Sequence, residues 1–366
     1  MRFKKYDTNW DRKKLSDHVK KITRKNSNNV IKNVICNSAQ NGLIPQLDFF
    51  DKEIANDENT AGYYIISNGD FVYNPRKSLS APYGPVNIYK YDSDGIVSPL
   101  YLCFSVDDCI NKSFLLQRFK SPCWYRYIYL NGDSGARHDR VSIKDEVFLS
   151  QLINLPNAEE QAAIAEFLEK IDERISVQNK IISKYETLIK GLCDKIFRHD
   201  KSVCLFDLVK CKASTLQENE VATYYNGKYN VFGASGIIAS INKYQFEEDG
   251  ILVLKDGSKA GKIQYAGGKY SVVGTSVVLI PNNAGDARYL YFAMQSIDFD
   301  KYKVGSGIPH IYFKDYSCER IYYPNPALRI RIAKALDAYE TKVEIEKEML
   351  SALQKQKAFL LQSMFI

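Results

Sequence analysis

One pattern constrains the fold of this chain more than any other, because the opening of a long helix occurs in it twice. Residues 155–168 read LPNAEEQAAIAEFL, and residues 323–336 read YPNPALRIRIAKAL. At a constant offset of 168 positions the two stretches align without a gap, and the identical pairs are Pro156 and Pro324, Asn157 and Asn325, Ile164 and Ile332, Ala165 and Ala333, and Leu168 and Leu336. A repeat that stays in register over this length indicates a duplicated structural element.

Apolar residues follow each opening at alternating intervals of four and three positions, which is the a/d pattern of a coiled coil. In the first copy this seam runs from Ile164 to Ile196, and in the second it runs from Ile332 to Met364. Asn157 can cap the first helix, because its side chain can accept a hydrogen bond from a free backbone amide. We expect two helices of about 40 residues, each about 60 Å long, that pair as an intramolecular antiparallel coiled coil.

The segments that precede the two helices resemble each other more weakly. NGDFVYN at 68–74 resembles EDGILVL at 248–254, since each is a short apolar strand after a Gly/Asp turn. SGARH at 134–138 likewise resembles SGIPH at 306–310. The expected fold class is therefore α+β, with two mixed α/β domains in tandem, in pseudo-two-fold relation, separated by the two long helices. The expected boundaries are 1–153 for the first domain, 154–198 for the central helix, 199–323 for the second domain and 324–366 for the C-terminal helix.

The distribution of charge favours nucleic acid as the ligand of both domains. The net charge is +7, and residues 1–30 alone hold ten Lys/Arg against three Asp. Basic side chains mix with Tyr, Asn and Gly in loops at matching places of the two repeats, and such residues contact phosphates and base edges. Each lysine taken singly fits an ordinary solvated surface, but the two matching clusters favour DNA. The candidate contacts are Tyr73, Asn74, Arg76, Lys77, Tyr83, Arg137, His138 and Arg140 in the first domain, and Lys255, Lys259, Lys262, His310 and Lys314 in the second.

The sequence carries no recognisable catalytic or metal-binding motif. GSKAGKI at 257–263 has neither the spacing nor the Ser or Thr of a phosphate-binding P-loop. The four histidines have no metal-ligand spacing and the eight cysteines form no CxxC pair, so no metal is expected. No apolar run is long enough to span a bilayer, and the N-terminus lacks the apolar stretch of a signal peptide. A cytoplasmic protein with no membrane role is expected.

The order of domain, LPxxxEQxxIxxxL helix, domain and helix resembles the specificity subunit of type I restriction–modification enzymes over the whole chain. The residues that carry the resemblance are Leu155, Pro156, Glu160, Gln161, Ile164 and Leu168. The resemblance implies that each domain reads one half of a bipartite site in double-stranded DNA. It also implies that the paired helices fix the spacing between the half-sites, and that the chain itself is not an enzyme.

The same resemblance implies partner subunits and the surfaces that bind them. Two methyltransferase (modification) subunits would dock along the helices, and restriction subunits would join them to form the nuclease. S-adenosylmethionine, ATP and Mg²⁺ would belong to those partners, with no cofactor in this chain. The second helix departs from the pattern, since Leu328-Arg329 stand where the first has Glu160-Gln161. The candidate docking residues are Glu160, Gln161, Ile164, Leu168, Ile332 and Leu336.

Two other functions fit parts of the same pattern. A coiled-coil adaptor without DNA specificity would have the helices but would be indifferent to duplex DNA at low salt. A self-contained DNA-modifying enzyme, such as a nuclease or methyltransferase, would cut or methylate DNA without partners.

Overall fold

A computed structural model of the chain describes residues 2–6, 9–48, 60–134, 139–198, 202–221, 226–305 and 307–365. The chain divides into two compact units. Unit 1 comprises Met1–Val177 with Leu350–Ile366, and unit 2 comprises Gln178–Met349. Each unit therefore contains a β-rich domain and one part of each long helix.

The two predicted long helices are confirmed. Helix α4 spans Ala158–Phe197 over 40 residues, and α9 spans Pro326–Met364 over 39 residues. Each begins with the expected cap, since Asn157 Oδ1 accepts from the Glu160 amide at 2.9 Å and Asn325 Oδ1 accepts from the Leu328 amide at 3.0 Å. No helix in the described part of the chain is long and apolar enough to cross a membrane.

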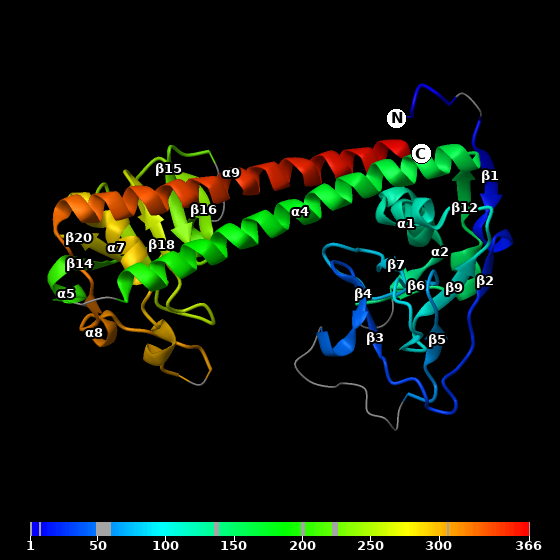
Figure 1. Cartoon of the computed structure of the whole chain (residues 1–366), viewed down its shortest axis with the longest axis horizontal. Helices are drawn as coiled ribbons and strands as arrows, with labels where there is room; N and C mark the ends of the chain where they lie inside the picture. Colours follow the sequence, from blue (N-terminus) through cyan, green and yellow to red (C-terminus); the bar gives the residue numbers. More distant parts are fainter. Residues whose placement is uncertain are drawn as a thin grey trace. The chain divides into compact units, whose positions relative to one another are not determined.

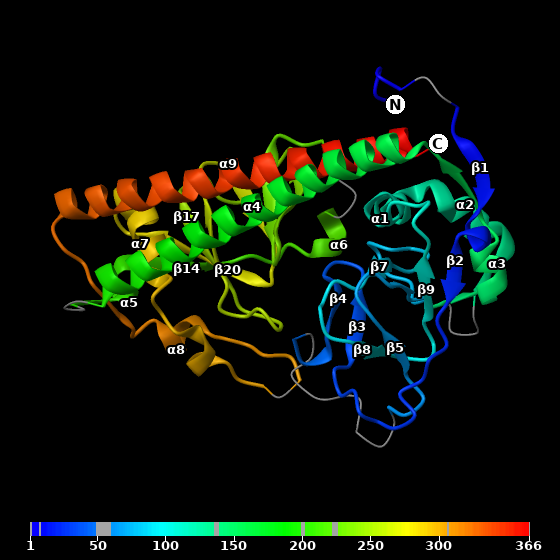
Figure 2. The ribbon, with the colours of Figure 1, turned by 45° about the vertical axis from the view of Figure 1, so that its right-hand side comes forward.

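The two helices pack side by side in antiparallel directions (Figures 1 and 2). In unit 1, Ile164 and Leu168 of α4 share a core with Leu360 and Met364 of α9. In unit 2, Gln178 Nε2 donates to the Glu346 carbonyl at 3.0 Å. Gln178 and Glu346 occupy equivalent seam positions of the two repeats, 168 residues apart, and both are buried. Each provides a hydrogen-bond partner for the other across the helix pair, which buried polar side chains require.

The strands of the two units follow the same order. In unit 1 an antiparallel sheet has the order β2-β9-β6-β7, and in unit 2 the order is β14-β20-β17-β18. An additional antiparallel pair closes each domain just before its long helix, β1 with β12 in unit 1 and β13 with β21 in unit 2. The weak sequence similarity of the two halves thus reflects a true structural duplication.

The elements of unit 1 that precede α4 are short. They are β1 (Asp11–Lys14), η1 (Leu15–Asp17), β2 (Val19–Lys21), β3 (Ile35–Ser38), β4 (Gly42–Pro45), η2 (Gln46–Asp48), β5 (Tyr64–Ile66), β6 (Phe71–Tyr73), β7 (Val86–Ile88), β8 (Gly95–Val97), β9 (Leu102–Val106), α1 (Lys112–Lys120), η4 (Pro122–Trp124), α2 (Tyr125–Asn131), β10 (Asp133–Ser134), β11 (Val141–Ser142), α3 (Asp145–Leu149) and β12 (Leu152–Leu155).

Unit 2 has a matching series between the two long helices. It comprises β13 (Val203–Cys204), α5 (Leu205–Leu208), β14 (Val209–Ala213), α6 (Glu218–Val221), β15 (Tyr229–Gly233), β16 (Gly236–Ile241), β17 (Gly250–Leu254), β18 (Ile263–Ala266), β19 (Tyr270–Val272), β20 (Ser276–Pro281), η5 (Ala284–Asp286), α7 (Ala287–Met294), η6 (Phe299–Tyr302), α8 (Phe313–Tyr316) and β21 (Arg320–Ile321).

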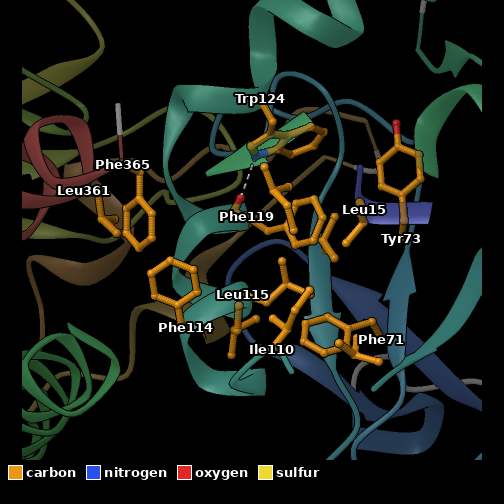
Figure 3. Packing of buried hydrophobic residues seen from close by; sticks show 14 of the residues in the cluster. Leu15, Phe71, Tyr73, Ile110, Phe114, Leu115, Phe119, Trp124, Leu361 and Phe365 are labelled. Atoms are coloured by element: carbon orange, nitrogen blue, oxygen red, sulfur yellow. Dashed lines mark hydrogen bonds between the residues drawn. The ribbon is translucent and has the colours of Figure 1, made fainter. Parts of the chain in front are cut away.

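Aromatic side chains form the core of unit 1 (Figure 3). Trp124 is buried, and its indole N–H donates to the Phe119 carbonyl at 3.0 Å. Phe365, next to the end of α9, packs on Phe114 of α1 with ring centroids 5.3 Å apart. Burying a side chain of this size contributes about 1.5–3 kcal/mol. The C-terminal end of α9 is therefore part of the hydrophobic core of the first domain.

Candidate nucleic-acid interface

In unit 1 the loop after β6 lies against the segment that begins at Asp139. Arg76 and Arg140 form an antiparallel β-bridge. The Lys77 amide donates to the Asp139 carbonyl at 2.8 Å, and the Val141 amide donates to the Pro75 carbonyl at 2.9 Å. Two arginines that are far apart in the sequence, both predicted as DNA contacts, are thus held next to each other by the backbone.

Both arginine side chains are exposed, and they line a cavity of about 480 Å³. Within the described ranges of the chain, neither guanidinium has a carboxylate partner or a side-chain hydrogen bond. Burial raises the pKa of Tyr101 in the same cavity, and the charge of Arg140 partly opposes that rise. A free guanidinium fork matches the O6 and N7 acceptors of guanine or the oxygens of a phosphate.

The structure corrects one of the predicted contacts, Tyr73, because its side chain lies inside unit 1. Tyr73 is 2% exposed; its hydroxyl donates to the Tyr83 carbonyl at 2.9 Å and its ring stacks on Phe148. Asn74 is also buried, and its Oδ1 accepts from the Arg76 amide at 3.0 Å. Tyr73 is a core residue, and Asn74 positions the start of the Arg76 loop.

Four further predicted contacts of the first domain remain predictions, and two of them lie outside the described residues. Tyr83 is half-buried, and its ring lies 5.0 Å from that of Tyr125. Lys77 is half-buried beside the arginine bridge. Arg137 and His138 lie outside the described residues.

In unit 2 an equivalent bridge joins the loop after β17 to the segment that ends SGIPH. Asp256 and His310 form an antiparallel β-bridge, and His310 Nδ1 lies 2.8 Å from Asp256 Oδ1. Lys255 Nζ lies 3.9 Å from the other oxygen of the same carboxylate. Asp256 thus contacts two predicted DNA-binding residues, one from each loop, and its carboxylate offsets part of the positive charge of Lys255.

The remaining predicted lysines of unit 2 lie in different surroundings. Lys259 is exposed, and Lys314 is exposed with its Nζ 5.6 Å from the centroid of the Tyr312 ring. Lys262 lines a separate cavity of about 520 Å³, whose other walls include Glu186 and Glu340 of the long helices. Lys262 therefore lies near acidic side chains, a setting that suits DNA phosphates less well than that of Lys259.

The two bridges occupy the same place in the two sheets and differ in chemistry. Each joins a residue two or three positions after a buried central strand, β6 or β17, to a residue at the end of the SGIPH sequence or two positions after the SGARH sequence. Unit 1 places Arg against Arg there, and unit 2 places Asp against His. One duplicated frame thus presents two different sets of hydrogen-bonding groups.

Comparisons with known proteins agree with this duplication. The family model described as "Type I restriction modification DNA specificity domain" matches residues 8–187 and, a second time, residues 201–355. The chain belongs to this family. Each match covers one β-rich domain and most of the long helix that follows it. A sequence search against curated proteins gives no significant match.

Members of the type I specificity family with solved structures share this fold over nearly the whole chain. The type I restriction–modification system S subunit from M. genitalium is 17% identical, with a TM-score of 0.63 over 98% of this chain and 97% of that chain. A chain from a study of complex assembly and conformational transition of the type I R-M system is 15% identical, with a TM-score of 0.57 over 97% of each chain. At these identities the likeness shows the fold alone.

The helix openings of this specificity-family chain are held by equivalent residues of different chemistry. Gln161 Nε2 donates to the Pro156 carbonyl at 3.0 Å, and its Oε1 accepts from the Asn111 amide at 2.8 Å. Arg329, at the same position of the second repeat, donates to the Pro324 carbonyl and forms a two-bond ion pair with Asp286 at 2.8 and 3.1 Å. The side-chain amide of Gln161 attaches α4 to its domain, and the Arg329–Asp286 ion pair attaches α9 to its domain.

Glu160 also has an internal role. Its side chain is fully buried, and it accepts two hydrogen bonds from Arg2 at 2.6 Å each and one from the Trp10 indole at 3.2 Å. Part of the basic N-terminal segment thus pairs with protein. Of the other predicted docking residues, Gln161, Ile164, Leu168 and Leu336 are buried and Ile332 is half-buried within their own units. All six support the helices, and their contact with a partner stays a prediction.

Proposed function

We propose that this chain is the DNA-specificity subunit of a type I restriction–modification complex, in which each unit reads one half of a bipartite site. The proposal rests above all on one observation. The specificity family model matches each half separately, and the two halves place different side chains on an equivalent bridge. Recognition of two different half-sites requires two similar domains that present different hydrogen-bonding side chains to the DNA.

In unit 1, Arg76 and Arg140 are the residues that we expect to read bases. Their guanidinium groups are exposed, adjacent and without carboxylate partners within the ranges described. A bidentate Arg–guanine contact is the commonest specific contact of protein with the major groove. In unit 2 we assign Lys255, Lys259 and Lys314 to phosphates, because a flexible ammonium group acts as a point charge, and His310 to a polar contact at the base edge or backbone.

The paired helices serve in this proposal as the spacer between the half-sites and as the docking surface for two methyltransferase subunits. Large apolar side chains lie exposed on both helices, which suits protein contacts along their outer faces. These are Phe167, Val177, Leu188, Ile330, Ile345, Met349 and Phe359. Glu160 and Gln161 then act indirectly, by holding the start of α4. Methyl transfer and cleavage, with S-adenosylmethionine, ATP and Mg²⁺, belong to the methyltransferase and restriction subunits, and this chain is not catalytic.

The decisive experiment is methylome sequencing of cells that express the cognate methyltransferase with and without this chain. We expect a bipartite methylated motif only when this chain is present. Arg76→Ala and Arg140→Ala should each relax one half of that motif and weaken binding of the methyltransferase-bound complex by about 1–3 kcal/mol. Arg126→Ala, which removes an exposed arginine of α2 outside the cavity, is the matched control and should leave the motif unchanged.

A salt series separates the two kinds of contact. Lys259→Ala should weaken binding to specific and scrambled duplexes alike, and should reduce the slope of log K against log salt by about one unit. Methylation of the same motif without this chain, or an unchanged motif in both arginine variants together with unchanged affinity, would refute the assignment.

A further inference from the structure

Three side chains with metal-binding atoms converge at one edge of the main sheet of unit 1. They are His18, which follows η1, and Asp107 and Cys109, which follow β9. The imidazole nitrogen, a carboxylate oxygen and the thiol sulfur all lie within 4.8 Å of one another. His18 Nδ1 already lies 3.0 Å from Asp107 Oδ2. Asp107 and Cys109 are exposed, so an ion can enter from solvent.

We propose that His18, Asp107 and Cys109 form a binding site for a divalent transition-metal ion, with zinc the ion that the ligands fit best. Imidazole nitrogen, carboxylate oxygen and thiolate sulfur are the ligands that zinc takes in proteins, at about 2.0–2.3 Å. Tetrahedral bonds of that length separate the ligand atoms by about 3.3–3.6 Å, so small side-chain rotations suffice. Three protein ligands leave the fourth position to water. On binding, the Cys109 thiol releases its proton to solvent and the neutral His18 imidazole carries its one proton on Nε2. Bonds from Nδ1 and from the Asp107 carboxylate to the metal then replace the direct His18–Asp107 hydrogen bond.

The backbone already fixes the three ligands in place. The Asp107 amide donates to the His18 carbonyl at 2.9 Å. Asp107 Oδ1 accepts from the Cys109 amide at 3.0 Å, which leaves Oδ2 directed to His18. These bonds continue the β2–β9 ladder, whose last pair is Val19 with Val106. Little conformational entropy is lost on binding, because the ligands come from ordered backbone.

Unit 2 shows that the fold itself does not require these three residues. The equivalent ladder ends with Val209 opposite Pro281, and the Asn282 amide donates to the Leu208 carbonyl at 2.8 Å, as Asp107 does to His18. Leu208 and Asn282 thus stand where unit 1 has His18 and Asp107, and Ala284 follows where unit 1 has Cys109. The same turn forms without a metal-binding set, so the trio in unit 1 is an addition to the fold.

Hydrogen bonds from Gln161 connect this site to the first turn of α4. Gln161 Nε2 donates to the Cys109 carbonyl at 3.2 Å, and Gln161 Oε1 accepts from the Asn111 amide. A metal bound by His18, Asp107 and Cys109 would join the β9–α1 turn to the segment between η1 and β2. The turn that holds Gln161 would then be more rigid, and the start of α4 would be more firmly attached to its domain.

Cobalt and zinc titrations of the full chain, freed of metal by a chelator, test the site. We expect one Co²⁺ to bind with a sulfur-to-cobalt charge-transfer band and the visible bands of a four-coordinate site, and one Zn²⁺ to displace it. Cys109→Ser should abolish the charge-transfer band, and His18→Ala should weaken binding at least about tenfold. Cys211→Ser, which changes an exposed cysteine of unit 2, is the matched control and should bind as the parent does.

Alkylation of the unmodified protein gives a second measurement that needs no variant. Zinc should protect Cys109 from iodoacetamide in peptide mapping and leave the exposed Cys211 and Cys318 reactive. Binding that persists unchanged in both His18→Ala and Cys109→Ser would overturn the proposal. So would alkylation of Cys109 at the same rate with and without zinc.

Discussion

At the scale of single residues, positions 161 and 329 are equivalent in the two repeats. They show that the duplicated fold accepts a neutral amide or a charged guanidinium at the same place. Gln161 satisfies backbone groups with a neutral amide, whereas Arg329 meets the carboxylate of Asp286. Arg329 and Asp286 are 5% and 3% exposed, so both charged groups are buried away from solvent. A buried ion pair adds little net stability over apolar side chains, but removal of one partner leaves an uncompensated charge.

This asymmetry predicts a double-mutant result. Arg329→Met should destabilise unit 2 by about 3–5 kcal/mol, because Asp286 stays buried without its guanidinium partner. Arg329→Met with Asp286→Leu should recover most of that loss. Hydrogen exchange of peptides from α7 and the first turns of α9, followed by mass spectrometry, reports the local stability. Additive losses in the double variant would show that the two side chains do not depend on each other.

The candidate site could be predicted from sequence only in part, and the burial of single side chains explains the difference. Arg76 and Arg140 are exposed and His310 is half-buried, because charged and polar side chains next to glycines and turns rarely enter a core. Their contact with DNA stays a prediction. Tyr73 was misassigned because β6 is buried on both faces, so its sequence shows no alternation that marks an outer face. His18 and Asp107 gave no signal, since they meet only through the pairing of β2 with β9.

At the scale of elements, the long helices were predictable because one apolar period persists over their whole length. The sequence does not show how the polar side chains of the two helices pair. Asp172 of α4 receives a hydrogen bond from Gln117 at 3.0 Å and forms ion pairs with Lys120 and Lys357. These contacts join α1, α4 and α9 in unit 1. Which carboxylate meets which lysine depends on the register of the helices, which the sequence of either helix alone does not fix.

The pKa of Asp172 makes this cluster sensitive to acid. Burial alone would raise it, but the charges of Lys120 and Lys357 and the bond from Gln117 outweigh burial and hold it below its usual value. Because the folded pKa is depressed, the carboxylate's contribution is complete above the unfolded pKa, about 3.9, and is lost as pH falls through the folded pKa.

Asp172→Asn should therefore destabilise unit 1 at pH 7, by about 1–2 kcal/mol for a partly exposed carboxylate. Its difference from the parent should shrink as the pH falls below about 4. Urea unfolding followed by tryptophan fluorescence measures unit 1 alone, since the two tryptophans, Trp10 and Trp124, both belong to it. Glu166→Gln, an exposed change on the same helix, is the control. A difference that stays constant down to pH 3 would contradict the assignment.

At the scale of the whole molecule, the two domains are built alike but carry different side chains at the equivalent bridge, so they should be exchangeable. Replacement of residues 1–153 by the corresponding domain of another specificity-family chain should change one half of the methylated motif and leave the other half intact. Replacement of residues 199–323 should do the reverse. Methylome sequencing of both hybrids is the measurement. If either exchange altered both halves, the two domains would not read DNA independently.

Unit 2 is one continuous stretch of chain. The core of unit 1, in contrast, is completed by Leu360, Leu361 and Met364 of α9 and by Phe365. A ribosome makes these residues after all of unit 2, so the core of unit 1 can be completed only after unit 2 has been translated. Unit 2 can fold as it emerges, whereas Phe114 and Ile164 stay without their packing partners until the end of α9 has been made. For the same reason, a premature stop codon in the last turns of α9 would destabilise the domain of unit 1, which is encoded farther from that codon. The domain of unit 2, which is encoded closer to it, would keep its stability.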